Sequence, residues 1–460
     1  MPRFRAPAAL LRLPIAPCGL LPGLCLCLCV CAGLSACAGP SRLDLPERDG
    51  LAPALEALKH DGAVLQTPLS LDAVAILVVQ NNPDLRAVRA QAGVARAQLL
   101  QAGILPNPSV TAAILPLAAG IGDTTAWNAG LTEDVRALIL LHSRRQAARA
   151  TAQQVDAQIL WQEWQTIGRA WLLAVQIAEG ERAQRLLDRS LGLYARRDRA
   201  SEQAMLQGNA TLSAVAPDRA ALQGAEAQAR DLARLQQQRR HELAALMGLM
   251  PDAPLPLAAM ASLPPEQPAA IEALLPSLAR RRPDLVALQL GYRAENARLR
   301  GAVLARFPNL LFGVAGGSDN VNTRTVGPQV SLELPIFDRN QGGIAIETAT
   351  RQQLHAEYAA RLASAVGQVR AMLSEQALQQ QQIRHLKREL VQAQADAVSA
   401  ANALAAGNLD ERSAVDLIAT RFSKEVELVA IEQSIAEQQV AIAALLGLGM
   451  RPVSLPGSNG

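Results

Sequence analysis

Histidine, cysteine and serine most often carry catalysis or hold a metal, so their spacing is the first guide to the chemistry the chain can perform. The five histidines, at positions 60, 142, 241, 355 and 385, are scattered, and no two stand at the i, i+4 spacing of a helical metal site. The serines near them form no nucleophile elbow. The Gly-Gly pairs at 316–317 and 342–343 lack the G-x-G-x-x-G pattern of a phosphate loop. We therefore expect no catalytic site, no metal site and no cofactor.

The cysteines instead point to processing of the N-terminus. All six occur at or before Cys37, in or beside an apolar run at 20–34 that follows three arginines. This order is typical of a secretory signal. The run ends in Leu-Ser-Ala-Cys, which resembles a bacterial lipobox, so we predict a signal peptide at 1–36 and lipidation of Cys37. The alternative is an N-terminal membrane anchor, for which the run is barely long enough.

What remains after Cys37 has no cysteine pair for a disulfide or a zinc site. Ala38 follows the lipidated position, and by resemblance to other bacterial lipoproteins this favours sorting to the outer membrane. Aromatic residues make up only 3% of the sequence, while Ala, Leu, Gln, Arg and Glu dominate, which indicates long helices. The net charge is +3 with acids and bases interspersed, so there is no basic stripe for nucleic acid.

The chain contains two copies of one unit, about 200 residues apart. Four landmarks recur in the same order: Pro-Asp-Leu at 83–85 and 283–285, Pro-Asn at 106–107 and 308–309, Gly-Asn at 208–209 and 407–408, and Leu-x-Gly-Leu at 246–249 and 445–448. Chance similarity between alanine-rich helices explains one such match but not four in order. We therefore predict structural repeats at 70–260 and 261–452, after a lipidated linker at 37–69 and before a tail at 453–460.

Each copy begins with a short helix and continues with a β-hairpin. A proline starts the helix, because the first turn has no partner for the missing N–H, and we expect about 22 residues in each. The pattern then changes to strict alternation of apolar and polar residues, at 126–132 in the first copy and 326–336 in the second. We predict hairpins at about 108–135 and 308–336, with strands of about 10 to 12 residues.

Strands of this length match the length that a tilted strand needs to span a bilayer. Four strands per chain are too few to close a barrel, so oligomerisation is implied. Periodicity alone fits an ordinary soluble hairpin equally well. Pro328 inside the last strand argues against a regular strand, since proline cannot donate to a ladder.

Long stretches without proline follow each hairpin. In the second stretch, apolar residues recur at spacings of three and four, as in a coiled coil. We predict long helices at about 137–207 and 339–406, each roughly 100 Å long, which turn at glycines and return at 212–248 and 411–447. The fold class is therefore mainly α with a β part, with hairpins at one end of a long antiparallel helical stalk and glycine turns at the other.

This pattern resembles the TolC family of outer-membrane factors over about residues 65–452. The resemblance is carried by the Pro-Asp-Leu helix starts, Leu-Pro-Asn-Pro at 105–108, Leu-Pro-Ile-Phe-Asp-Arg-Asn-Gln-Gly at 334–342 and the terminal Leu-Leu-Gly motif. The segment at 334–342 looks most like the heavy-metal subgroup, which serves resistance-nodulation-division pumps. Residues 134–139 depart from the family pattern, which leaves the junction between the second strand and the first long helix open.

The resemblance implies a homotrimer that builds a twelve-stranded transmembrane β-barrel in the outer membrane and a helical tunnel through the periplasm. It implies a lipid-anchored exit duct of a tripartite efflux system in a Gram-negative bacterium. A periplasmic adaptor protein and an inner-membrane resistance-nodulation-division pump would be its partners. The channel would conduct its cargo passively, and heavy-metal cations or drugs are the cargo that the resemblance suggests.

The resemblance also assigns roles to the two glycine turns. Gly208, Asn209 and Ala210, with Gly407, Asn408 and Leu409, would contact the adaptor. Acidic residues just after the second turn, Asp410 and Asp416, are candidates for the gate of the closed tunnel, and Arg412 is a candidate partner that holds it closed. A ring of three carboxylates repels itself and favours cations. Alternatively, these acids only complement the dipole at a helix start.

A protein of another class fits part of the pattern. A periplasmic lipoprotein adaptor or coiled-coil scaffold would carry one helical hairpin flanked by β-rich domains, whereas this chain has two similar copies and four strands. Trp161, Trp164 and Trp171 form one stripe on the first long helix, and we interpret the stripe as packing between helices, with drug binding as the alternative.

Overall fold

The computed structural model describes residues 43–48, 50–60, 67–258 and 267–448. The chain divides into two units, Met1–Gly50 and Leu51–Gly460. The described residues of the first unit contain no helix or strand. The predicted signal peptide, Cys37 and the tail at 453–460 lie outside the described residues.

Every described helix and strand belongs to the second unit. The first repeat contains, in order, the 3-10 helix η1 (Leu55–Ala57), α2 (Leu71–Asn81), α3 (Pro83–Ala102), β1 (Ser109–Leu115), β2 (Ala126–Asp134), α4 (Val135–Leu206) and α5 (Leu212–Leu246). The second repeat contains α6 (Pro268–Leu274), the 3-10 helix η2 (Leu275–Ser277), α7 (Leu278–Arg281), α8 (Pro283–Leu304), β3 (Asn309–Ser318), β4 (Arg324–Glu333), α9 (Gln341–Ala405) and α10 (Glu411–Leu446).

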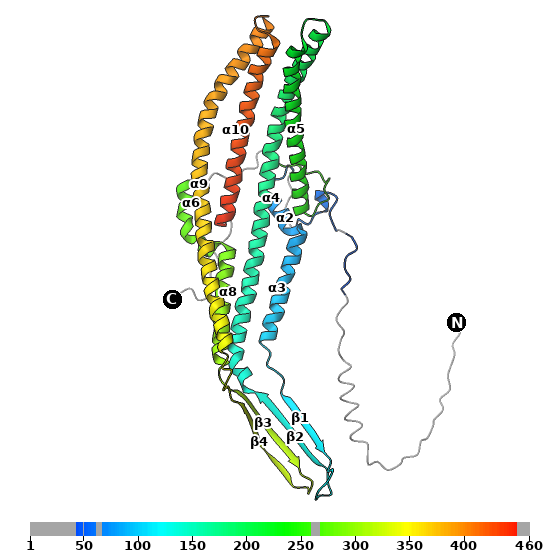
Figure 1. The fold of residues 1–460 in the computed structure, drawn as a ribbon, viewed down its shortest axis with the longest axis vertical. Coiled ribbons are helices and arrows are strands. Elements are labelled where there is room, and N and C mark those ends of the chain that lie inside the picture. The colour runs from blue at the N-terminus through cyan, green and yellow to red at the C-terminus, as the bar shows by residue number, and fades with distance from the viewer. Residues whose placement is uncertain (1–42, 49, 61–66, 259–266, 449–460) are drawn as a thin grey trace, which may run out of the picture. The chain divides into compact units, whose positions relative to one another are not determined.

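The predicted fold class is confirmed: the unit is mainly helical, with two antiparallel hairpins. Figure 1 shows the four strands at one end of the long helices and the α4–α5 and α9–α10 turns at the other. The strands have 7, 9, 10 and 10 residues, so β1 and β2 are shorter than the predicted 10 to 12 residues and β3 and β4 just reach that length. For β1 the reason is local, because Pro108 precedes it and Pro116 follows it, and proline cannot donate to a ladder.

Polar side chains and glycines begin and end the helices. The side-chain oxygen of Asn82 accepts a hydrogen bond from the Leu85 backbone N–H at 2.9 Å, and Pro83 fills the first turn of α3. The Asn82 amide also donates to the Leu246 carbonyl at 2.9 Å, which ties the start of α3 to the end of α5. Gly248 and Gly447 lie just past α5 and α10 with φ of +71° and +63°, the left-handed conformation expected after a helix.

The junction at 134–139, where the sequence departs from the family pattern, contains no turn. Asp134 ends β2, and its Oδ1 accepts a hydrogen bond from the Ala137 N–H at 3.0 Å, so Asp134 also caps α4. In the second repeat, seven residues at 334–340 separate β4 from α9. The first long helix therefore continues directly from its strand.

The two hairpins form one antiparallel sheet in the order β1-β2-β3-β4, in which β2 pairs with β3 and so joins the two repeats. The register places the apolar residues of all four strands on one face: Val110, Ile114, Trp127, Leu131, Phe312, Val314, Val326, Val330 and Leu332. All of them are exposed in this single chain. Pro328 lies in β4, an edge strand, which is where sheets tolerate proline.

Each repeat has its own core in the middle of the helices, where α2 or α6 packs against the long helices. The first core includes Val74, Leu77, Leu243 and Met247, and the second includes Leu278 and Leu285 with other residues of α6, α9 and α10. The short helices α2 and α6 were not predicted, because apolar runs of 7 to 11 residues are too short to show a clear helical period.

The predicted tryptophan packing is confirmed. Trp164 and Trp171 lie edge to face with ring centroids 5.8 Å apart, and their indole N–H groups donate to the carbonyls of Ala444 and Leu71 at 2.9 and 2.8 Å. The Arg282 guanidinium stacks over Trp161, 4.9 Å from the ring centroid. Within the part of the chain that the structure describes, no helix combines the length and the apolarity needed to cross a membrane.

Candidate functional site at the glycine-turn end

The two glycine turns have the same backbone geometry. Gly208 and Gly407 have φ of +76° and +72°, and a Cβ at either position would meet no atom within 4 Å. Conformation rather than space therefore requires glycine here. The Asn209 and Asn408 N–H groups donate back to the Ala204 and Ala403 carbonyls, each at 2.8 Å, and so close both helix ends in the same way.

The turns present small and apolar groups to solvent. The glycines and asparagines are exposed, while Ala210 and Leu409 are half-buried. Leu206 and Leu212, on either side of the first turn, are 79% and 69% exposed. The first turn thus leaves apolar area exposed to solvent.

Asp410 has a local structural role. Its carboxylate accepts a hydrogen bond from the Ser413 N–H at 2.9 Å, so Asp410 is the N-cap of α10. Hydrogen bonds from the Ser413 side chain and backbone lower the pKa of Asp410. Asp410 therefore fits the alternative from the sequence, in which the acid only stabilises the start of a helix.

Arg412 and Asp416 lie one turn apart on α10, but each binds a residue of the first repeat. The Arg412 Nη2 donates to Asp218 Oδ2 on α5 at 2.7 Å and to the Ala214 carbonyl. The Asp416 Oδ1 accepts a hydrogen bond from Arg197 Nη1 on α4. Within this chain the Arg412 guanidinium thus binds α5, and its role in holding a gate closed stays a prediction.

Asp218 and Arg197 join these contacts into one cluster. Arg197 Nη2 lies 2.5 Å from Asp218 Oδ1, and the side chains are 7% and 0% exposed. The Ser201 hydroxyl on α4 donates to Asp218 Oδ2. We call Arg197, Ser201, Asp218, Arg412 and Asp416 the ion cluster. It connects α4, α5 and α10 near the glycine turns.

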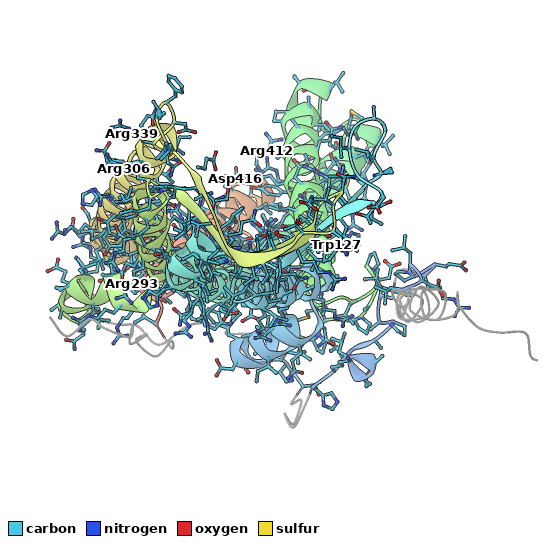
Figure 2. All side chains as sticks on the ribbon, turned by 90° about the horizontal axis from the view of Figure 1, so that it is seen from below. Trp127, Arg293, Arg306, Arg339, Arg412 and Asp416 are labelled. Atoms are coloured by element: carbon cyan, nitrogen blue, oxygen red, sulfur yellow. The ribbon has the colours of Figure 1, made fainter. Side chains whose placement is uncertain are left out.

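In the view along the helices, Arg412 and Asp416 lie on the concave side of the curved sheet (Figure 2). Their side chains are 43% and 58% exposed. The cluster thus has a buried part, Arg197 with Asp218, and a solvent-facing part, Arg412 and Asp416. Rearrangement of α10 can break the solvent-facing contacts while the buried pair stays whole.

Comparison with known proteins gives one family. Residues 274–448 match the family model described as "Outer membrane efflux protein". No curated protein sequence matches significantly. This part of the chain is similar to outer membrane efflux proteins. The matched part is the second repeat, and the first repeat has the same order of short helix, hairpin, long helix and return helix.

Solved outer-membrane channels have the same fold as this chain. The CmeC channel of Campylobacter jejuni superposes with a TM-score of 0.68 at 13% identity, covering 90% of this chain and 95% of that one. The MtrE channel of Neisseria gonorrhoeae in its open state gives 0.64 at 16% identity, covering 89% and 99%. The outer-membrane channel OprN gives 0.66 at 18% identity, covering 88% and 98%. These likenesses show the fold of the chain.

Electrostatics keep the ion cluster charged. Burial alone would raise the pKa of Asp218, but hydrogen bonds from Arg412, Ser201 and Arg197 lower it below its ordinary value. Burial lowers the pKa of Arg197, yet its bonds with Asp218 and Asp416 raise it overall. A second contact between α4 and α5 lies alongside, where Arg219 Nη2 is 3.1 Å from Glu202 Oε1.

Sequence reasoning missed the buried half of the cluster. A signal was present, because Asp218 stands ten residues after Gly208 and Asp416 stands nine after Gly407, which are nearly equivalent positions of the two repeats. A comparison of the residues that follow the glycine turn in each copy would have identified Asp218. Arg197 has no such signal. Among the described residues, no three His, Cys, Asp or Glu side chains gather as a metal site requires.

Proposed function

We propose that this protein is the outer-membrane exit duct of a tripartite efflux system. A homotrimer would receive cargo from an inner-membrane pump through a periplasmic adaptor, and would conduct it passively. The observation that carries this proposal is the sheet. One face is apolar and exposed, and both edge strands, β1 and β4, lack a neighbour on one side within the described chain.

Three copies resolve both features of the sheet. Pairing β4 of one copy with β1 of the next would close twelve strands, four from each chain, and leave no free edge. The apolar face would then contact lipid, and the opposite face, with Thr111, Asn128, Gln329 and Ser331, would line the passage. An adaptor or scaffold needs no such sheet, so nothing in this structure favours that rival.

The glycine turns at the far end of the helices would meet the adaptor. Leu206 and Leu212 offer exposed apolar area, and the backbone of Gly208-Asn209 and Gly407-Asn408 leaves room for close approach. The segment at 334–342 supports service to a resistance-nodulation-division pump of the heavy-metal subgroup, with metal cations or drugs as cargo. Lipidation of Cys37 would anchor the duct on the periplasmic side of the outer membrane.

We also propose that the ion cluster closes the periplasmic mouth. It holds α10 against α4 and α5 close to the turns. Further from the turns, Arg182 Nη1 on α4 binds Glu432 at 2.6 Å and Trp164 binds the Ala444 carbonyl. When adaptor contact releases Arg412 and Asp416, the end of α10 next to the turn can swing while its remainder stays attached.

The mass of the detergent-extracted protein tests the duct. We expect a trimer that dissociates on heating and forms channels in planar bilayers, with acylation at Cys37 detected by mass spectrometry and lost in Cys37→Ala. A water-soluble monomer would rule out the duct. A lipidated trimer that forms no channel would support the proposed assembly and contradict the proposed conduction of cargo.

A further inference from the structure

A buried carboxylate lies in the helices next to the sheet, away from the ion cluster. Glu295 on α8 is 1% exposed. Its Oε2 accepts a hydrogen bond from Arg298 Nη1 at 3.1 Å. Its Oε1 is also buried and has no hydrogen-bond partner among the described residues. An unsatisfied buried carboxylate oxygen is costly, so this oxygen needs a donor.

The side chain that faces Glu295 is a second acid. The Glu347 carboxyl on α9 lies within hydrogen-bonding reach of Glu295. Two carboxylates are both acceptors and cannot satisfy each other, whereas a single added proton supplies the missing donor. Arg298 makes no bond to Oε1, and its Nη2 donates instead to Thr151 on α4 at 3.0 Å.

The other groups packed here do not neutralise the pair. Among the described residues, the cation that acts on Glu347 is Arg298, and it already serves Glu295 Oε2. From α4 the recorded neighbours of α8 at this level, Ser143, Thr151 and Gln154, are uncharged. Two carboxylates and one guanidinium leave a net charge of −1 beside a buried oxygen, which favours uptake of a proton.

We propose that Glu295 and Glu347 form a proton-binding site, in which one proton carried by Glu347 is donated to Glu295 Oε1 and ties α9 to α8. The site lies within about three turns of the helix ends that adjoin the strands. Binding takes one proton from solvent onto a Glu347 oxygen, and release returns it to solvent. The proposal stands on this geometry and does not depend on the proposed duct.

The titration of Glu347 falls in the physiological range. The hydrogen bond with Glu295, burial and repulsion from Glu295 raise the pKa of Glu347 from 4.5 to about 7, against the lowering effect of Arg298. Because the pKa is raised in the folded state, the added stability is fully present below the unfolded value and is lost as pH rises through about 7. The contact of α8 with α9 therefore loosens in mildly alkaline medium.

Hydrogen exchange tests the site in the intact, detergent-solubilised protein. Glu347→Gln keeps the shape and replaces the shared proton by a permanent amide donor. At pH 8 we expect backbone exchange at 341–352 to be up to about tenfold slower in Glu347→Gln than in the wild type, and equal at pH 6. Variant and wild type are compared at the same pH, so the intrinsic exchange rate cancels. Equal rates at both pH values would overturn the proposal.

A matched control separates this effect from loss of any surface charge. Glu357→Gln, on the same helix, removes an exposed pair with Arg361 at 2.8 Å and should exchange like the wild type at both pH values. Slower exchange in this control would also overturn the proposal. Infrared spectroscopy gives a second readout. We expect the band of a protonated carboxyl at pH 6, which disappears as the pH rises with a midpoint near pH 7. The band should be absent in Glu347→Gln.

A divalent cation is the other ligand that two carboxylates can hold. Magnesium and calcium chloride, each added to the wild type at pH 8, test this directly. If either salt slows exchange at 341–352 and EDTA reverses the effect, the ligand is a cation rather than a proton, and the proposal is overturned. Exchange that neither salt nor chelator changes supports the proton.

Discussion

The Arg197 guanidinium on α4 lies 2.5 Å from the Asp218 carboxylate on α5, and protein covers both side chains almost completely. This buried pair is the fixed part of the ion cluster. Arg412 and Asp416 bind to it from α10 and keep much of their surface in solvent. The helices α4 and α5 therefore form a stable unit near their turn, and α10 attaches to that unit through contacts that water can replace.

Loss of the Asp218 charge should destabilise the protein strongly. Asp218→Asn leaves Arg197 buried with only Asp416 as an anionic partner, and breaking a buried pair in this way costs about 3 to 5 kcal/mol. Urea unfolding of the helices in detergent, followed by circular dichroism, measures the loss. Glu226→Gln, which breaks an exposed pair with Arg230 on the same helix, should change the free energy of unfolding by less than about 0.5 kcal/mol.

The two acids after the second turn should behave differently. Asp416→Ala removes the α10 contact with Arg197, so we expect a higher leak conductance in planar bilayers. Asp410→Ala removes a helix cap, which costs about 1 kcal/mol of stability, and should leave the leak unchanged. Equal leak in both variants would separate the ion cluster from the gate.

The closed state should resist acid over a wide range. Because hydrogen bonds hold the pKa of Asp218 below its ordinary value, the pair contributes stability above that value and loses it only as pH falls through the lowered pKa. We therefore expect constant leak conductance from pH 8 to 5 and opening below about pH 4. Opening with a midpoint near pH 6 would show that another group controls the mouth.

Much of the fold follows from spacing that survives in a single sequence. Repeated prolines and glycines mark where each helix begins and turns, so the long helices were predicted at 137–207 and 339–406 and lie at 135–206 and 341–405. The partners across helices could not be predicted in this way. Contact between Arg412 and Asp218 depends on the rotation of α10 about its axis relative to α5, and a small error in that rotation selects another residue.

The glycines of the sheet provide a sharp test of its register. Gly317 lies in β3 between two paired strands, and an added Cβ would lie 2.5 Å from the Trp127 carbonyl oxygen, closer than real contacts allow. Gly327 lies in the edge strand β4, where an added Cβ meets no atom within 4 Å. Gly317→Ala should therefore abolish the heat-dissociable oligomer in outer-membrane extracts, while Gly327→Ala should keep it. If both variants assemble, β2 and β3 do not pair in this register, and the repeats join in another way.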